Sequence, residues 1–188
     1  NGLANGLTYR YAVQALGPAG RSNLSEEVSA TPRTVPLAPL NPWAIPGNRY
    51  LLLTWDLPAF DGGSAITEYR VYEEGGLVGN STTNEFVHSL LIPREAHTYV
   101  VRAVNEAGES PASASFLGIP DVPPGPPSNL SVTGGANNVT LVWDRPLDNG
   151  GSEPCGYNVY RAAGAAPMEA LISLNASLYS YIDYGLES

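Results

Sequence analysis

Few residues in this 188-residue chain have the chemistry of a catalyst or of a metal ligand. There are two histidines, His88 and His97, and no His-x-x-His or paired-cysteine pattern adds the further ligands of a zinc site. The single cysteine, Cys155, cannot form an internal disulfide, and we expect it to be a small filler at a strand edge. The sequence therefore predicts no catalytic residue, no metal site and no cofactor, and we expect the chain not to be an enzyme.

Aspartates occur in pairs that could bind calcium. Asp56 and Asp61, and again Asp144 and Asp148, lie on either side of a loop, and carboxylate oxygens are the ligands that Ca²⁺ prefers. Their spacing does not follow the alternating acidic pattern of a calcium-binding loop. We interpret them as part of a hydrated acidic rim that keeps the protein soluble. The glutamates that we group with this rim are Glu73, Glu74, Glu106 and Glu109.

Two glycine pairs, Gly62-Gly63 and Gly150-Gly151, could suggest a phosphate-binding loop. Neither is followed by a lysine or by a predicted helix, which such a loop needs, so we interpret both pairs as turns. The chain contains no lysine and has a net charge of −9, so it repels nucleic acids and anionic membrane surfaces. The longest aliphatic run is Leu51-Leu52-Leu53, far short of the ~20 residues of a membrane-spanning helix. We expect no nucleic-acid partner and no membrane insertion.

Five Asn-x-Ser/Thr sequons are candidate sites of N-linked glycosylation if the chain is secreted. They begin at Asn23, Asn80, Asn129, Asn138 and Asn175. An Arg-Gly-Asp adhesion motif is absent from the sequence.

An internal repeat determines how the chain is organised. The segment around Trp55 reappears around Trp143, at an interval of 88 residues. The same interval places residues 3–15 over residues 91–103. The first segment therefore repeats the end of the central unit, and the last segment repeats its beginning.

The repeated units have the pattern of β-strands. Large apolar residues alternate along Leu51–Trp55 and along Tyr9–Ala15, which directs them to one face of a strand. Clusters of Gly, Pro, Asn and Asp separate such segments, as turns do. Residues 166–174 contain good helix formers, but they align with the Gly-rich residues 75–80 of the central unit, so we predict no helix there. The chain is expected to be all-β.

A set of aromatic and apolar residues recurs at fixed places within each unit. It consists of the tryptophans Trp55 and Trp143, the Tyr-x-Val pairs Tyr69/Val71 and Tyr157/Val159, the Tyr-x-Tyr-x-Val-x-Ala run from Tyr9 to Ala15, and the corner leucines Leu3, Leu91 and Leu186. This pattern resembles that of tandem fibronectin type III modules. The resemblance implies immunoglobulin-like β-sandwiches of seven strands, each with its own core.

One position departs from the family pattern. The corner tyrosine, Tyr9 after Leu3, is replaced in the central unit by His97 after Leu91. The resemblance implies that the corner side chain bonds the backbone, and an imidazole could keep this hydrogen bond. We favour that structural role. The alternative is a pH-sensitive latch, because histidine titrates near neutrality.

The resemblance divides the chain into one complete and two partial modules. Residues 1–33 correspond to strands F and G of one module, residues 35–120 to a complete module, and residues 122–188 to strands A to E of a third. We expect a fragment of a longer array in which neighbouring modules of the same chain are the partners. In a less favoured alternative, the hairpin of one copy completes the partial sandwich of another, head to tail.

Two sequence motifs suggest the class of organism and the location of the protein. The Gly-Gly-Ser segments and Tyr-Asn-Val-Tyr-Arg161 are most similar to modules of prokaryotic secreted or surface proteins, which implies an extracellular or cell-surface location. Giant intracellular muscle proteins contain similar modules, and this alternative stays open.

We expect the chain to act as a non-catalytic spacer and presentation segment of a multidomain protein. Pro-rich junctions at residues 31–39 and 119–127 would limit hinge motion, and loops could make weak contacts with proteins or polysaccharides. The alternatives are a specific adhesion or receptor module and an accessory region of a secreted carbohydrate-active enzyme. Trp43, Tyr72 and Tyr160 are the candidate stacking platforms for sugars, although we expect Trp43 to be buried.

Overall fold

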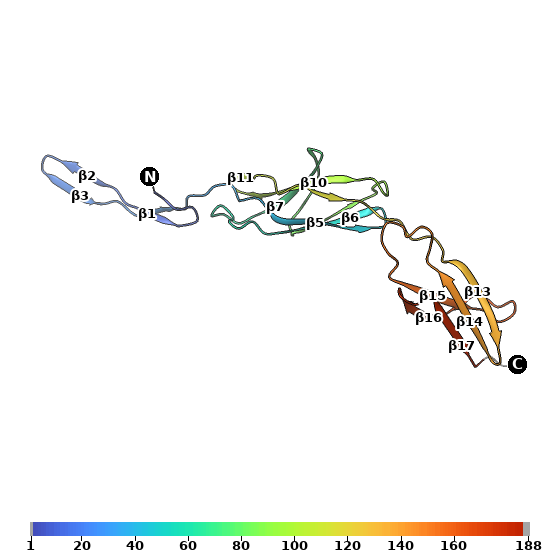
Figure 1. The fold of residues 1–188 in the computed structure, drawn as a ribbon. Helices are drawn as coiled ribbons and strands as arrows, with labels where there is room; N and C mark the ends of the chain where they lie inside the picture. Colours follow the sequence, from blue (N-terminus) through green and yellow to red (C-terminus); the bar gives the residue numbers. More distant parts are fainter. Residues whose placement is uncertain (1, 186–188) are drawn as a thin grey trace. The chain divides into compact units, whose positions relative to one another are not determined.

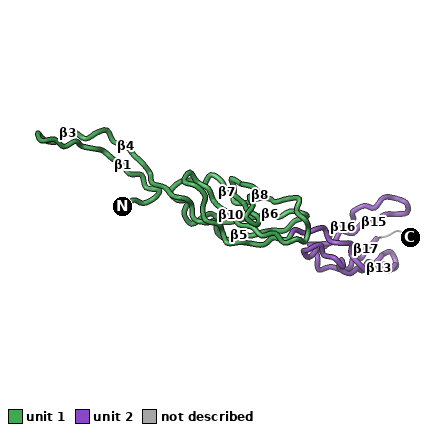
Figure 2. The backbone as a smooth tube through the Cα atoms, turned by 90° about the horizontal axis from the view of Figure 1, so that it is seen from above, with its two compact units in different colours: residues 1–119 green, residues 120–188 purple. Residues whose placement is uncertain are grey.

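The computed structural model describes residues 2–185, in which the regular structure consists of seventeen β-strands (Figure 1). None of these residues belongs to a helix with the length and apolar character needed to cross a bilayer. The all-β prediction is confirmed, and the segment with good helix formers contains strand β16, Glu169–Asn175. The chain divides into two compact units, residues 1–119 and 120–188 (Figure 2). The predicted corner residue Leu186 lies outside the described residues.

Two antiparallel sheets form the central module within the first unit (Figure 1). One sheet has the strand order β5-β6-β9, and its strands are β5 Leu40–Gly47, β6 Tyr50–Asp56 and β9 Glu85–Ser89. The other has the order β11-β10-β7-β8, with β12 also paired to β10. Its strands are β7 Glu68–Glu73, β8 Gly76–Ser81, β10 His97–Asn105, β11 Gly108–Glu109 and β12 Phe116–Gly118. This is the two-layer arrangement of an immunoglobulin-like sandwich.

The core of the central module lies between these two sheets. Trp55 is 2% exposed and its ring lies 5.3 Å from that of Tyr69, while Tyr99 and Val101 of β10 are fully buried. These residues come from alternate positions of β6, β7 and β10, so the period-two pattern directs them to the same interior. The predicted core position of Trp55 is confirmed.

The N-terminal segment is a long hairpin of four short strands. Its strands are β1 Tyr9–Tyr11, β2 Gln14–Gly17, β3 Gly20–Leu24 and β4 Val28–Ala30. Strand β1 pairs with β4, and β2 pairs with β3. Tyr11 lies opposite Val28, as Tyr99 lies opposite Phe116 in the central module, so the internal repeat extends to strand pairing.

The second unit contains a three-stranded sheet, β13-β14-β17, and a two-stranded sheet, β15-β16. Its strands are β13 Ser128–Gly135, β14 Asn138–Asp144, β15 Gly156–Arg161, β16 and β17 Ser180–Tyr184. Trp143, Tyr157 and Val159 form a separate small core, and Trp143 is 4% exposed, as predicted. The connection from β15 to β16 is longer than its two-residue counterpart, Glu74–Gly75.

Candidate functional site

The four aspartates considered as calcium ligands each accept a hydrogen bond from a nearby strand or turn. Asp56 accepts a hydrogen bond of 2.8 Å from the Asn41 side chain, and Asp144 accepts one of 2.7 Å from Asn129. Asn41 and Asn129 both have a positive φ, 45° and 52°, at a bulge in β5 and β13. These amide–carboxylate bonds therefore support an irregular backbone at equivalent places of the two units.

The second aspartate of each pair binds the backbone of the glycine turn. The Asp61 carboxylate accepts a hydrogen bond of 2.8 Å from the Gly63 amide, and that of Asp148 accepts one of 2.9 Å from the Gly150 amide. Gly62 has a φ of +83°, and a Cβ there would lie 2.0 Å from the carbonyl oxygen of Thr34. The Gly-Gly pairs therefore form turns in which another backbone segment approaches closely, as only glycine permits. Within residues 2–185, no group of three or more Asp, Glu, His or Cys side chains is arranged to hold a metal ion.

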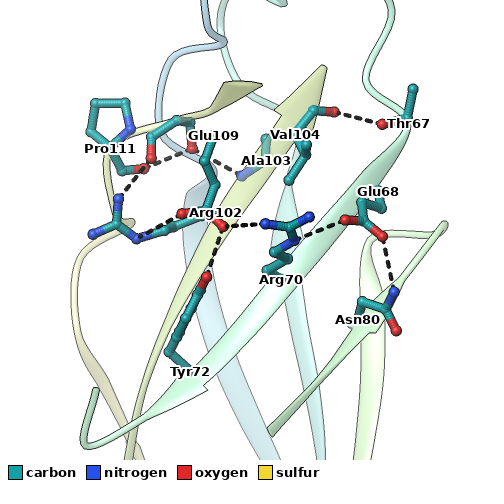
Figure 3. Close-up of polar contacts among 11 residues, drawn as sticks. Thr67, Glu68, Arg70, Tyr72, Asn80, Arg102, Ala103, Val104, Glu109 and Pro111 are labelled. Carbon is teal, nitrogen blue, oxygen red and sulfur yellow. Dashed lines mark hydrogen bonds and ion pairs between the residues drawn. The ribbon is translucent and has the colours of Figure 1, made fainter. Parts of the chain in front are cut away.

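A cluster of charged and polar side chains covers the outer face of β7 and β10 (Figure 3). The Arg70 guanidinium donates to Glu68 at 2.8 Å and to Glu109 at 3.1 Å, and the Tyr72 hydroxyl donates to Glu109 at 2.7 Å. The Arg102 guanidinium lies over the Tyr72 ring, 5.9 Å from its centroid. Two cations and two carboxylates thus balance one another on this face.

The hydrogen bonds of this cluster shift the protonation equilibria of its members. The bonds from Asn80 and then from Arg70 lower the pKa of Glu68. The hydrogen bond to Glu109, with burial second, raises the pKa of Tyr72. These shifts favour the charged form of Glu68, which accepts from Asn80 and Arg70, and the neutral form of Tyr72, which donates to Glu109. The cluster is a paired structural network, and its charges are already neutralised within the module.

This cluster is not among the features that the sequence predicts. The sequence does indicate where these side chains point, because Arg70 and Arg102 alternate with the buried residues of their strands. Such positions show that a side chain faces outward, but its partners depend on the register between β7 and β10, in which Arg102 lies opposite Arg70. Glu109 is not part of the hydrated rim expected from the sequence but accepts hydrogen bonds from both Arg70 and Tyr72.

The expected backbone hydrogen bond of His97 is not formed. In the N-terminal hairpin, the Tyr9 hydroxyl accepts a hydrogen bond of 2.8 Å from the Ala4 amide, as a corner tyrosine does. His97 instead places Nδ1 2.5 Å from a carboxylate oxygen of Glu73, and its Nε2 is buried without a hydrogen-bond partner. The imidazole is shorter than a phenol, so it bonds the neighbouring strand β7 and not the distant backbone.

The expected burial of Trp43 is also wrong, because its side chain is 68% exposed. The register of β5 against β6 shifts between Leu40 and Trp43, and after this bulge Ala44 faces the core while Trp43 and Ile45 face solvent. Of the other two aromatic candidates, Tyr160 is 53% exposed. Tyr72 is covered by Arg102 and hydrogen-bonded to Glu109, so its ring is engaged within the module.

The five sequons lie on strands or at strand ends, and four of their asparagines are exposed, Asn138 being half-buried. The side chains of Asn80 and Asn129 donate to Glu68 and Asp144, and that of Asn175 accepts from the Ser177 amide. A glycan on Asn129 would have to replace the bond that supports its bulge. The use of these sequons stays a prediction.

Comparison with known proteins agrees with this architecture. Residues 38–117 match the fibronectin type III domain family. Titin of Drosophila melanogaster is 31% identical over an alignment that covers 95% of this chain and 1% of the fly protein. The chain is built of tandem fibronectin type III modules. Exoglucanase B of Cellulomonas fimi is 34% identical over 59% of this chain and 11% of its own length.

A solved structure shows the same fold. The FN1–FN3 domains of chicken CNTN1 match 97% of this chain and 67% of that chain, with 20% identity and a TM-score of 0.57. This likeness concerns the fold alone. The chain spans 1% of the length of the fly titin and 11% of the length of exoglucanase B, so it corresponds to a small part of each of these relatives.

Proposed function

We propose that this chain is a non-catalytic spacer and presentation segment of a larger extracellular or cell-surface protein. The observation that supports this role best is the self-contained core of the central module, whose buried residues, from Ala44 to Ala103, all belong to that module. Its outer charges on β7 and β10 are paired with one another. A module that satisfies its own groups can be repeated along a chain without a specific ligand.

The neighbouring modules of the same chain are the proposed partners. Thr34, in the junction before the central module, donates its amide to the Gly62 carbonyl at 2.9 Å and accepts from the Asn105 side chain at 2.8 Å. Val122 repeats the first of these bonds with Gly150 at 2.8 Å. Each junction is therefore anchored to the glycine turn of the module that follows it, which restricts the linker on that side.

A binding screen tests the passive role. The chain is applied to arrays of glycans and of extracellular proteins, and we expect no saturable, reproducible signal. A specific hit would replace the spacer role by that of an adhesion or receptor module.

A second candidate function is polysaccharide binding, as in an accessory region of a carbohydrate-active enzyme. It is favoured by the exposed indole of Trp43, next to the exposed Ile45 on the same face of β5, and by the similarity to exoglucanase B. Aromatic rings offer flat apolar faces on which sugar rings stack. In the second unit, Ser131 occupies the position of Trp43, so the fold does not require an aromatic residue there.

The two functions are distinguished by one variant. Binding to insoluble polysaccharides is measured for the chain and for Trp43→Ala, with Trp43→Phe as the control that keeps an aromatic face. Polysaccharide binding predicts retention of the chain and of Trp43→Phe and loss in Trp43→Ala. Equal behaviour of all three proteins would eliminate Trp43 as a platform.

A further inference from the structure

The outer face of the β5-β6-β9 sheet in the central module carries a row of exposed apolar side chains. In the register of the three strands, Ile45 lies beside Leu52, and Leu52 lies beside Val87. Ile45 is 45% exposed and Val87 is 54% exposed. Trp43 and Tyr50 lie on the same face, on opposite sides of this row. These positions alternate with residues that face the core, so the sandwich presents apolar side chains that its own core does not use.

The second unit shows that this sheet forms without such a row. In the central module, Ile45 lies opposite Leu52. At the corresponding places of the second unit, 88 residues later, Thr133 lies opposite Thr140. Polar side chains are the ordinary choice on the solvent side of an antiparallel sheet. The apolar row of the central module therefore has a role other than folding.

The ring of Tyr50 lies against the sheet and covers a glycine. A Cβ at Gly47 would lie within 2.6 Å of three atoms of this ring, so one face of the ring rests on the glycine backbone. Tyr50 is 40% exposed, which leaves the other face open to solvent. At the corresponding place of the second unit, the side chain of Asn138 covers Gly135. The central module thus holds an aromatic ring in a fixed orientation where the second unit has an amide, and a platform that is already in place costs little to order on binding.

The charges on this face restrict the partner that it fits. The outward positions of β5, β6 and β9 include the carboxylates Asp56 and Glu85 and no Arg or Lys. Asp56 accepts from Asn41, whereas the Glu85 side chain is exposed and has no ion-pair partner among the described residues. Glu85 lies across Thr54 from Trp43, so an acceptor of hydrogen bonds stands near the indole. These carboxylates and the net charge of −9 repel an anionic polymer, and they complement a neutral one that is rich in hydroxyl donors.

The edge of the sheet is less suited to a partner than its face. Strand β5 is the outer strand, and it contains Pro42 and Pro46, which have no amide to donate. The bulge at Asn41 makes the edge irregular as well. Addition of an extended peptide or of a strand from a second copy is therefore disfavoured.

We propose that this face binds a neutral polysaccharide chain that lies along β5, with one sugar ring stacked on Trp43 and another on Tyr50. The proposal rests on the second candidate function described above, polysaccharide binding. Trp43 and Gly47, over which the Tyr50 ring lies, are four residues apart on β5, or about 13 Å. This distance exceeds the length of one sugar ring, so the ligand is an oligosaccharide or a polymer. Ile45 contacts the apolar face of the sugars between the two rings, and Glu85 accepts hydrogen bonds from their hydroxyl groups.

Ligands of different length and charge test the class of partner. Binding of cellohexaose, cellobiose and hexagalacturonate to the intact chain is measured by isothermal titration calorimetry. We expect saturable binding of cellohexaose, which is long enough to reach both rings. Cellobiose reaches one ring only and is expected to bind roughly tenfold more weakly, the equivalent of one aromatic stacking contact. The anionic hexagalacturonate is expected not to bind.

Variants of the second platform test its position. Tyr50→Ala removes the ring, and Gly47→Ala displaces it while every aromatic residue is kept. Each is expected to weaken cellohexaose binding roughly five- to tenfold, and Tyr50→Phe is expected to keep the affinity. Tyr160→Ala is the matched control, because Tyr160 is an exposed tyrosine of the second unit, and we expect it to leave the affinity unchanged.

The outcomes separate this proposal from the function on which it rests. If none of the saccharides binds, both are wrong. Cellohexaose binding that is lost in Trp43→Ala but unchanged in Tyr50→Ala and Gly47→Ala would contradict the two-ring platform and leave polysaccharide binding in place. A preference for hexagalacturonate, or an equal loss in Tyr160→Ala, would also contradict the proposal. Dimers in sedimentation velocity that Trp43→Ala abolishes, without any binding of cellohexaose, would assign the face to a second copy instead.

Discussion

Tyr99 joins the apolar core of the central module to a small polar cluster at its edge. Its ring is fully buried and lies 5.8 Å from that of Phe116, while its hydroxyl lies 2.9 Å from Nδ1 of His88. His88 and His97 both lie beside Glu73, at 3.8 Å and 2.5 Å. A phenol in this place is held neutral by its surroundings.

This environment predicts a loss of stability in alkali. Burial, with the charge of Glu73 second, raises the pKa of Tyr99 above its ordinary value of 10.0. A raised pKa means that the folded state favours the protonated phenol, so the stabilisation is complete below pH 10 and is lost as the pH rises above that value. Urea unfolding followed by tryptophan fluorescence is expected to show a decreasing midpoint above pH 10 that is flatter in Tyr99→Phe. Tyr184→Phe, an exposed control, should retain the decrease.

The two tryptophans of the central module differ in burial, so their replacement by alanine is expected to cost different amounts of unfolding free energy. Trp55 is 2% exposed within the core, so Trp55→Ala is expected to cost roughly 3–5 kcal/mol of unfolding free energy. Trp43 is 68% exposed, and Trp43→Ala is expected to cost less than about 1 kcal/mol. Denaturant unfolding of both variants measures the difference. Similar losses would mean that Trp43 contributes to the core.

Strands and turns repeat between the units because the residues that require them repeat. The second glycine turn reproduces the first: Gly150 has a φ of +82°, and a Cβ there would lie 2.1 Å from the Val122 carbonyl oxygen. Alternating apolar residues and Gly-rich turns are local signals, which is why the all-β sandwich, the core tryptophans and the turns could be predicted from the sequence alone.

The contacts that were not predicted depend on how strands align. One extra residue in β5 reverses which side chains face the core, and this reversal exposes Trp43. The contact between His97 and Glu73 requires β10 to pair with β7, from segments far apart in the sequence. No spacing within a single strand carries that information.

Gly62 and Gly75 have similar φ angles, but replacement by alanine is expected to cost more unfolding free energy at Gly62. Gly75 has a φ of +87° and no neighbour within 4 Å of a Cβ, so Gly75→Ala is expected to cost ~1–2 kcal/mol from backbone strain alone. Gly62→Ala adds a clash with the Thr34 carbonyl oxygen and is expected to cost at least about 2 kcal/mol more. Equal losses in thermal unfolding would show that the Thr34 junction moves aside freely.

At the scale of the whole molecule, two cores in one chain predict two units that unfold separately. Trp55 and Trp143 belong to separate clusters of buried residues. Neither cluster includes a residue of the other unit, so loss of one core is expected to leave the other folded. Urea unfolding of Trp55→Ala is therefore expected to keep the transition that Trp143 reports, and loss of both transitions together would contradict independent modules.

The bulges at Asn41 and Asn129 have a consequence for a polypeptide that contains several modules of similar sequence. Both lie in the outer strand of a three-stranded sheet, β5 and β13, where a regular edge would offer its amides to any like sequence nearby. The irregular backbone, fixed by bonds to Asp56 and Asp144, interrupts that row of donors and acceptors. We expect this interruption to disfavour pairing between the edges of similar modules on one polypeptide.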